Sequence, residues 1–364
     1  NETTLSKNRV VSEIKSLPEL HIGHYFGAIE PWLGYQAGGE VCFMGIADLN
    51  SRADFPELKK RDGKKQVERI THLRENTYRT ALDLIACGVD PEKSVLYVQS
   101  LVPELAELYW VLNCFCPVGE LISLPQFIEK SDRLKNRKPA ERVVLSPAHL
   151  TLPVMQAAGI LLFRGNLVAM GEDQEKHIII TRLIANKFNF HVGQTYFEIP
   201  KAGYSEKGKR IKSLRHPSNK MRISAETPRG HIGLFDSEES IMENIQKART
   251  DLGVDTLQAG TMSPGIENLF NILHSCGDIN NYKHLYNIYN EGKLDYQDLK
   301  QVVISNLVKL TDKIKSNRRE IKNDNIDIEE ILWESSKQTR SVTQEVLEEI
   351  RDLIGLPTKN KLKG

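Results

Sequence analysis

Short apolar runs alternate with segments of helical periodicity along the first half of the chain. Residues 8–14, 41–47 and 94–98 are apolar runs that predict buried strands. Residues 64–88 carry apolar side chains at helical spacing and end at Gly88, which predicts an amphipathic helix. Strands and helices that alternate in this way favour a parallel sheet with crossover helices. The predicted fold class is therefore α/β, with a Rossmann-like parallel sheet.

The rest of the chain changes from this pattern to an almost entirely helical one. We expect a helix at 104–116, a polar surface loop at 128–147, an apolar helix at 154–163, a strand at 168–170 and a helix at 177–188. Residues 190–230 are rich in turns and basic. Further helices are expected at 237–249, 264–275, 281–289, 294–321 and 327–354. This shift predicts an α/β domain at 1–215 and an all-helical domain at 216–364.

Composition narrows the class of protein. With 364 residues, 40% hydrophobic and 27% charged, the chain is typical of a globular protein of two domains. The net charge is only +1, but residues 201–230 hold nine Lys/Arg against two acidic residues, and 130–142 hold six against two. Such runs are usually solvated faces, although they also suit nucleic acid. Five scattered cysteines without paired zinc spacing predict reduced thiols and a cytoplasmic protein, and no apolar run is long enough for a membrane.

The segment Leu20-His21-Ile22-Gly23-His24 follows the first predicted strand. Gly23 permits close backbone approach to a ligand. His21 and His24 lie three residues apart at the start of a predicted helix, where free N–H groups attract phosphate. The alternatives are two surface histidines or part of a metal site.

Two later segments carry further candidate chemistry. Gly171-Glu172-Asp173-Gln174 lies between a predicted strand and a helix, where Asp173 could hold a ribose hydroxyl or an ammonium group, or simply cap the helix. Lys220-Met221-Arg222-Ile223-Ser224 lies in the basic region, where Lys220 could bind phosphate or be an ordinary surface lysine.

Together and in this order, these segments resemble the bacterial type of tryptophanyl-tRNA synthetase, a class I aminoacyl-tRNA synthetase. His21 to His24 matches the family's HIGH signature, and Lys220 to Ser224 stands where the family has KMSKS. The similarity covers essentially the whole chain. It implies a ligase, usually a homodimer, that uses ATP and Mg²⁺ to form an aminoacyl-adenylate and then charges tRNA.

The resemblance also implies which residues of this chain form the site. Catalytic roles would belong to His21, His24, Lys130, Lys220, Arg222 and Ser224. ATP would contact Ile14, Lys15, Gly23, His24, Gly171, Asp173, Arg210, Ile211, Lys220 and Met221. The amino acid would contact Leu152, Gln156, Gly159, Ile160, Val168, Met170, Glu172 and Gln174. No resident metal site is expected.

The departures from the family pattern fall on the chemistry. The family's opening Ser-Gly-Ile-Gln is here Ser12-Glu13-Ile14-Lys15, so a carboxylate stands where backbone should approach ATP. The second lysine of KMSKS is Ile223, and Arg222 is its nearest substitute. In the amino-acid pocket, the family's tyrosine is Leu152, its methionine is Gln156, and the aspartate that accepts the indole N–H is Gly159.

Three hypotheses follow from these departures. The first is a diverged synthetase that loads another amino acid, because Gly159 leaves space and Gln156 adds a polar group. The second is an ordinary tryptophan–tRNA ligase of a divergent lineage, in which Gln156 or a water replaces the missing carboxylate. The third is a non-catalytic protein that binds tRNA or nucleotide, against which the retained His21, His24 and Lys220 argue.

Overall fold

The computed structural model describes residues 8–53, 63–135, 146–170, 175–203, 211–223, 229–250 and 262–358. At its centre is a five-stranded, wholly parallel sheet with the strand order β3-β2-β1-β4-β5. The strands are β1 (Arg9–Lys15), β2 (Val41–Ala47), β3 (Ser94–Val98), β4 (Leu167–Ala169) and β5 (Lys201–Gly203). The predicted α/β class is confirmed.

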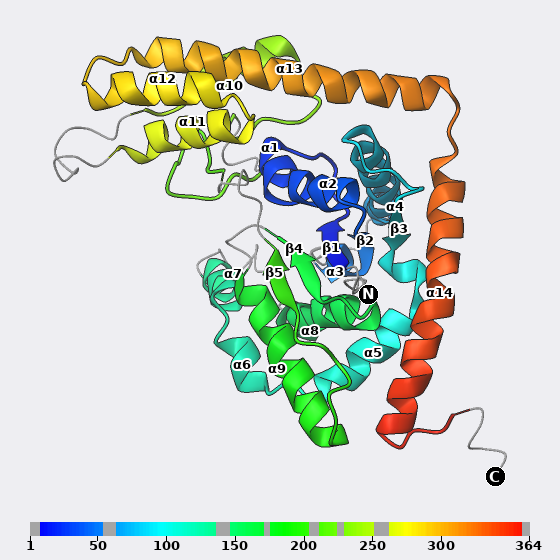
Figure 1. Ribbon diagram of the computed structural model, residues 1–364. Coiled ribbons are helices and arrows are strands. Elements are labelled where there is room, and N and C mark those ends of the chain that lie inside the picture. The colour runs from blue at the N-terminus through cyan, green and yellow to red at the C-terminus, as the bar shows by residue number, and fades with distance from the viewer. Residues whose placement is uncertain are drawn as a thin grey trace, which may run out of the picture.

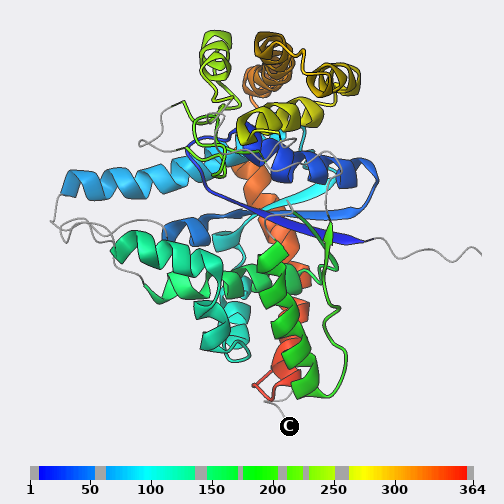
Figure 2. The same ribbon diagram turned by 90° about the vertical axis from the view of Figure 1, so that its left-hand side faces the viewer.

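The helices of the first half cover both faces of this sheet (Figures 1 and 2). One core contains Val10 and Ile14 of β1 and the helices that follow β1 and β2, and the other contains Val11 and the helices α5, α8 and α9. The helical segments are α1 (Ile22–His24), the π-helical turn η1 (Tyr25–Ile29), α2 (Glu30–Ala37), α3 (Asp48–Ala53), α4 (Gly63–Ala86), the 3₁₀ turn η2 (Gln99–Leu101), α5 (Pro103–Asn113), α6 (Val118–Ile122), α7 (Pro125–Lys135), α8 (Pro147–Leu162) and α9 (Glu175–Val192).

The second half is helical, as predicted. Its helices are α10 (Glu238–Gln246), α11 (Pro264–Ser275), α12 (Ile279–Asn290), α13 (Tyr296–Asn323) and α14 (Ile328–Leu353). In Figures 1 and 2, α10 to α13 stack above α1 and α2, whereas α14 turns back along the side of the sheet. The division of the chain near residue 215 stays a prediction.

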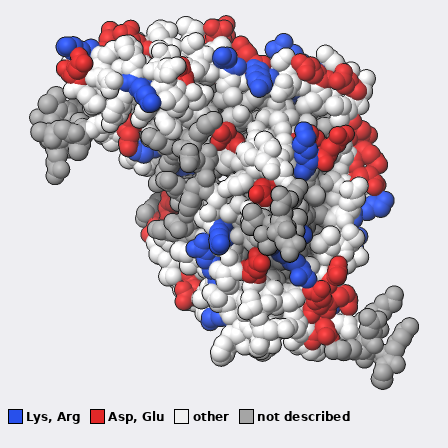
Figure 3. Space-filling view, in the orientation of Figure 1, with Lys and Arg blue, Asp and Glu red and all other residues white. Residues whose placement is uncertain are grey.

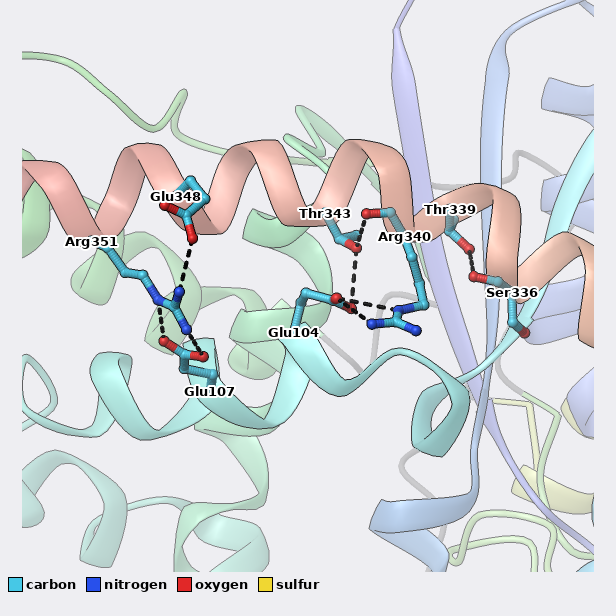
Figure 4. Close-up of polar contacts among 8 residues, drawn as sticks. All are labelled: Glu104, Glu107, Ser336, Thr339, Arg340, Thr343, Glu348 and Arg351. Atoms are coloured by element: carbon cyan, nitrogen blue, oxygen red, sulfur yellow. Dashed lines mark hydrogen bonds and ion pairs between the residues drawn. The ribbon is translucent and has the colours of Figure 1, made fainter. Parts of the chain in front are cut away.

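The helix α14 packs against the edge strand β3 and the helix α5 (Figure 4). Arg340 donates to the Glu104 carboxylate at 3.1 and 3.2 Å, and Arg351 donates to Glu107 at 2.5 and 2.6 Å. Burial raises the pKa of Glu104, but hydrogen bonds from Arg340, from the backbone and from Gln344, together with the Arg340 charge, hold this pKa below its usual value. The C-terminal helix is therefore anchored to α5 by charged pairs as well as by apolar packing.

Three sequence predictions need correction. Residues 128–135 belong to α7 and not to a surface loop, because Pro125 fits the first turn of a helix and no glycine or proline follows before residue 136. Likewise, Ser146 caps α8, and Pro147 is its first residue. The turn-rich region after residue 190 contains the short strand β5, which has too few residues to show a pattern.

Candidate active site

The cavity that lies beside β1 and β4 is at the point where the strand order reverses. From β1 the chain continues to β2 and β3 on one side of the sheet, and it then crosses to β4 and β5 on the other side of β1. Crevices at such switch points are the usual ligand sites of open parallel sheets. The lining residues are Val11, Ser12, Glu13, Gln156, Ile160, Val168, Ala169, Met170 and Ile178.

This cavity brings together much of the amino-acid site that the resemblance implied. Gln156 and Ile160 reach it from α8, and Val168 and Met170 reach it from the β4 segment. Gly159 is buried on the same helix, and its Cα faces the Glu13 side chain. Leu152 is not among the described residues that line the cavity. Glu172 and Gln174 lie outside the described residues.

The two histidines after β1 hold each other in a fixed arrangement. The backbone N–H of Gly23 donates to Nδ1 of His21 at 3.1 Å, and the N–H of His21 donates to Nδ1 of His24 at 3.2 Å. Their rings stack with centroids 3.7 Å apart. Because both Nδ1 atoms accept, each neutral ring carries its proton on Nε2. The Nε2–H group is therefore the donor that each ring retains.

The electrostatic surroundings keep these rings neutral. Burial, followed by the charge of His24, lowers the pKa of His21 to about 2. Burial and the charge of Lys220 lower the pKa of His24 to about 4. Because His21 is only 3% exposed, the prediction of two surface histidines is wrong. Among the described residues, no group of three or more His, Cys, Asp and Glu side chains could hold a metal ion.

The Lys220 segment lies against this histidine turn. A small hairpin joins residues 211 and 221, with the N–H of Met221 donating to the carbonyl of Ile211 at 3.3 Å. Met221 is buried, and its Cβ lies 3.6 Å from the position that a Cβ on Gly23 would take. That added Cβ would also lie 2.9 Å from the His21 ring, so Gly23 is required for the close packing. The structure thus places Lys220 near both histidines.

The remaining candidates fall into three groups. Lys15 is exposed at the end of β1, Ile14 is buried in the core, and Arg222 forms an exposed ion pair with Glu129 at 3.7 Å. For Lys130, the structure describes the backbone in α7 but not the side chain. Gly171, Asp173, Arg210 and Ser224 lie outside the described residues.

One residue is placed where the sequence did not predict it. The carboxylate of Glu13 turns into this cavity beside β1 and β4, and its Oε1 accepts from Tyr97 Oη at 3.1 Å and from Gln99 Nε2 at 3.0 Å. Burial, opposed by these two hydrogen bonds and assisted by the charge of Asp48, raises the pKa of Glu13 to about 7. The alternation of side chains along β1 was the available signal, since Val11 and Glu13 share one face.

Comparisons with known proteins agree over the full length of the chain. A family model described as tRNA synthetases class I (W and Y) matches residues 7–312. The tryptophan–tRNA ligase of Clostridium acetobutylicum is 32% identical, over 97% of this chain and 99% of that protein. The tryptophanyl-tRNA synthetase of Mycoplasma pneumoniae has a similar fold, with a TM-score of 0.82 at 24% identity, covering 97% and 99% of the two chains. That of Campylobacter jejuni, solved with ADP and tryptophan, gives 0.69 at 28% identity, covering 96% and 100%.

Proposed function

Because the chain belongs to the class I tRNA synthetases, in the tryptophanyl group, we propose that it activates tryptophan with ATP and transfers it to tRNA. In the first step, a carboxylate oxygen of tryptophan attacks the α-phosphorus of MgATP. The bond to the bridging oxygen breaks, and pyrophosphate leaves with that electron pair. The 3′ end of tRNA then displaces AMP from the tryptophanyl-adenylate.

The observation that carries this proposal is the grouping of donors at the histidine turn. Both histidines present Nε2–H groups, and Lys220 adds a positive charge close to them. Donors fixed in advance stabilise charge that develops on phosphate oxygens, and each is worth about 10²–10³ in rate. Since neutral imidazoles are not consumed as acids, their contribution is positioning and hydrogen bonding.

Mg²⁺ enters this scheme as part of the MgATP substrate. The ion commonly uses substrate phosphates and water with few protein carboxylates, so the donor set described here is compatible with it. In this scheme, ATP contacts the histidine turn and the Lys220 hairpin.

Tryptophan is proposed as the substrate because the relatives are tryptophan–tRNA ligases. A different amino acid is the alternative substrate, and a separate observation favours it. Gln156 and Gly159 differ from the family pattern at the cavity itself. ATP–pyrophosphate exchange with each common amino acid and with tryptophan analogues decides between them. Exchange driven best by tryptophan supports the proposal, and exchange driven by another amino acid identifies a different substrate. No exchange, together with salt-dependent tRNA binding, would indicate the non-catalytic alternative.

Transfer to tRNA is tested by charging a tRNA pool and identifying the acylated species. On the face shown in Figure 3, Lys and Arg side chains are interspersed with Asp and Glu, so attraction of tRNA to this face as a whole is weak. Much of the two basic stretches, including residues 136–145 and 204–210, lies outside the described residues. We therefore expect the charging rate to depend on these stretches more than on the net charge.

A homodimer is a further part of the proposal. An apolar groove on α5, α9 and the end of the chain is lined by exposed Trp110 and Phe190 and by Leu356. Phe190 is 90% exposed, and exposed apolar grooves of this kind commonly bind a protein partner. Sedimentation of the chain and of Phe190→Asp tests whether a second copy covers the groove. Across the described residues, no helix has the length and apolarity needed to cross a bilayer, and a cytoplasmic location stays a prediction.

A further inference from the structure

The Glu13 side chain occupies the amino-acid cavity in a defined orientation. Its Oε1 accepts two hydrogen bonds, from Tyr97 and from Gln99, and no described residue donates to Oε2. Gln99 is itself fixed, since its Oε1 accepts from the backbone N–H of Asn50 at 3.4 Å. Glu13 therefore holds one oxygen in a protein network and keeps the other for whatever enters the cavity.

Two glycines make the space for this arrangement. A Cβ on Gly159 of α8 would lie 3.0 Å from Cδ of Glu13 and closer still to Oε1. A Cβ on Gly45 of β2 would lie 3.0 Å from Cγ of Glu13 and 2.6 Å from the Tyr97 hydroxyl. Any larger side chain at residue 159 would displace the carboxylate, so Glu13 and Gly159 form one structural unit.

This unit reverses the pattern of the family. The resemblance places a glycine at residue 13 and an acceptor aspartate at residue 159, whereas this chain has Glu13 and Gly159. The carboxylate has thus moved from α8 to β1, and it lies directly against the Cα of the residue that lost it. The cavity walls around it are mainly apolar, with Ile160, Val168 and Met170.

We propose that Glu13 determines amino-acid specificity by accepting the indole N–H of tryptophan at Oε2, and that Gly159 is required for this position. The inference rests on the proposed function and deepens it. A substrate without the N–H would leave a buried oxygen unpaired, and sites of this kind discriminate by up to about 10⁴–10⁵. Gln156, which lines the same cavity, contributes shape and not the acceptor.

The test compares tryptophan with benzothienylalanine, in which sulfur replaces the indole N–H, by ATP–pyrophosphate exchange. The wild type should prefer tryptophan by at least about 10³ in kcat/KM. Glu13→Gln keeps the shape and can still accept from Tyr97 and Gln99, but it directs NH₂ at the indole. It should lower kcat/KM for tryptophan about 10²–10³-fold and leave the value for benzothienylalanine within about threefold.

A reciprocal exchange separates this role from general damage to the fold. The double variant Glu13→Gly/Gly159→Asp should recover kcat/KM for tryptophan to within about tenfold of wild type, whereas Gly159→Asp alone should not, because two carboxylates then crowd one space. Glu120→Gln, the same exchange at an exposed residue of α6 that does not line the cavity, is the matched control, and its preference for tryptophan should stay. Thermal melting verifies that each variant is folded.

The outcomes distinguish this inference from the proposed function. If the wild type uses tryptophan but Glu13→Gln keeps the wild-type preference, or if Glu120→Gln loses it, the role of Glu13 is refuted while the function stands. If the wild type neither binds tryptophan nor exchanges with it, the proposed substrate fails and the inference fails with it.

Discussion

The raised pKa of Glu13 predicts that the KM for tryptophan depends on pH near neutrality. Because Oε1 accepts from both Tyr97 and Gln99, a proton taken up by the carboxyl group resides on Oε2 and points at the indole N–H. Tryptophan then binds only the ionised form, so protons compete with it. The pKa of Glu13 is about 7, which makes the ionised fraction about 0.9 at pH 8 and about 0.1 at pH 6.

The expected magnitude follows from these fractions. The KM for tryptophan should rise about tenfold between pH 8 and pH 6, and further below that. Of the titratable groups facing Glu13, Tyr97 has its pKa raised by burial and by the Glu13 charge, so it remains a donor, and Asp48 adds to the rise at Glu13. His21 and His24, with pKa values of about 2 and 4, stay neutral throughout.

The assay is pyrophosphate exchange at saturating ATP across this pH range, with Glu13→Gln measured in parallel. That variant has no carboxyl group at residue 13 and reports every other pH effect on the reaction. A wild-type KM that stays constant from pH 8 to pH 6, or a variant that rises by the same factor, would refute the reasoning.

Three further predictions concern stability and rate. The folded pKa of Glu13 exceeds its ordinary value of 4.5, so the stability that its protonated form contributes is lost as pH rises through 7. The unfolding free energy of Glu13→Gln should therefore rise by about 2–3 kcal/mol relative to that of the wild type when the pH is raised from 5 to 8. Urea denaturation at both pH values measures this difference. Lys220→Met should lower kcat for adenylate formation about 10²–10³-fold. The control Lys212→Met on the same hairpin loses only an ion pair to Glu267 and should change kcat less than about threefold. Equal losses in the two variants would contradict the role of Lys220. Arg340→Ala should lower the unfolding free energy by about 1–3 kcal/mol, because its partner Glu104 is only 6% exposed and would lose its ion pair. Lys337→Ala, which removes an exposed ion pair on the same helix, should lower it by less than about 0.5 kcal/mol. Chemical denaturation measures both values, and equal values would show that burial of the Arg340 pair is not the reason.

The fold was largely predictable because its signals are local. The strands β1, β2 and β3 are apolar runs, and α10 to α14 repeat apolar side chains at helical spacing, so each element carries its own pattern. The π-turn η1 was not predicted, because the pattern of apolar residues does not distinguish a π-helical turn from an α-helical one.

The site was predictable in its parts but not in its assembly. The histidine turn and the Lys220 segment have recognisable sequences, and the structure brings them together. The sequence also displays Glu13 and Gly159 as separate departures, far apart in the chain. Their connection depends on the side of the sheet to which Glu13 points and on the register of α8 against β1, which are properties of the tertiary packing. The structure directs the Glu13 carboxylate toward Tyr97 and Gln99, and the interpretation that it stands where backbone should approach ATP stays a prediction.

The return of α14 to the sheet has a consequence for biosynthesis. Val346, Leu347 and Ile350 belong to the same core as α5 and α8, and Ser336 accepts the backbone N–H of Val98 at the edge strand. The N-terminal half leaves the ribosome first, yet part of its core and the cover of its edge strand β3 are missing until α14 emerges. Contacts between segments so distant in sequence form late and slowly. The nascent chain therefore completes the core around its sheet only once α14 has emerged, and a chain terminated before α14 leaves an unprotected strand edge that favours aggregation.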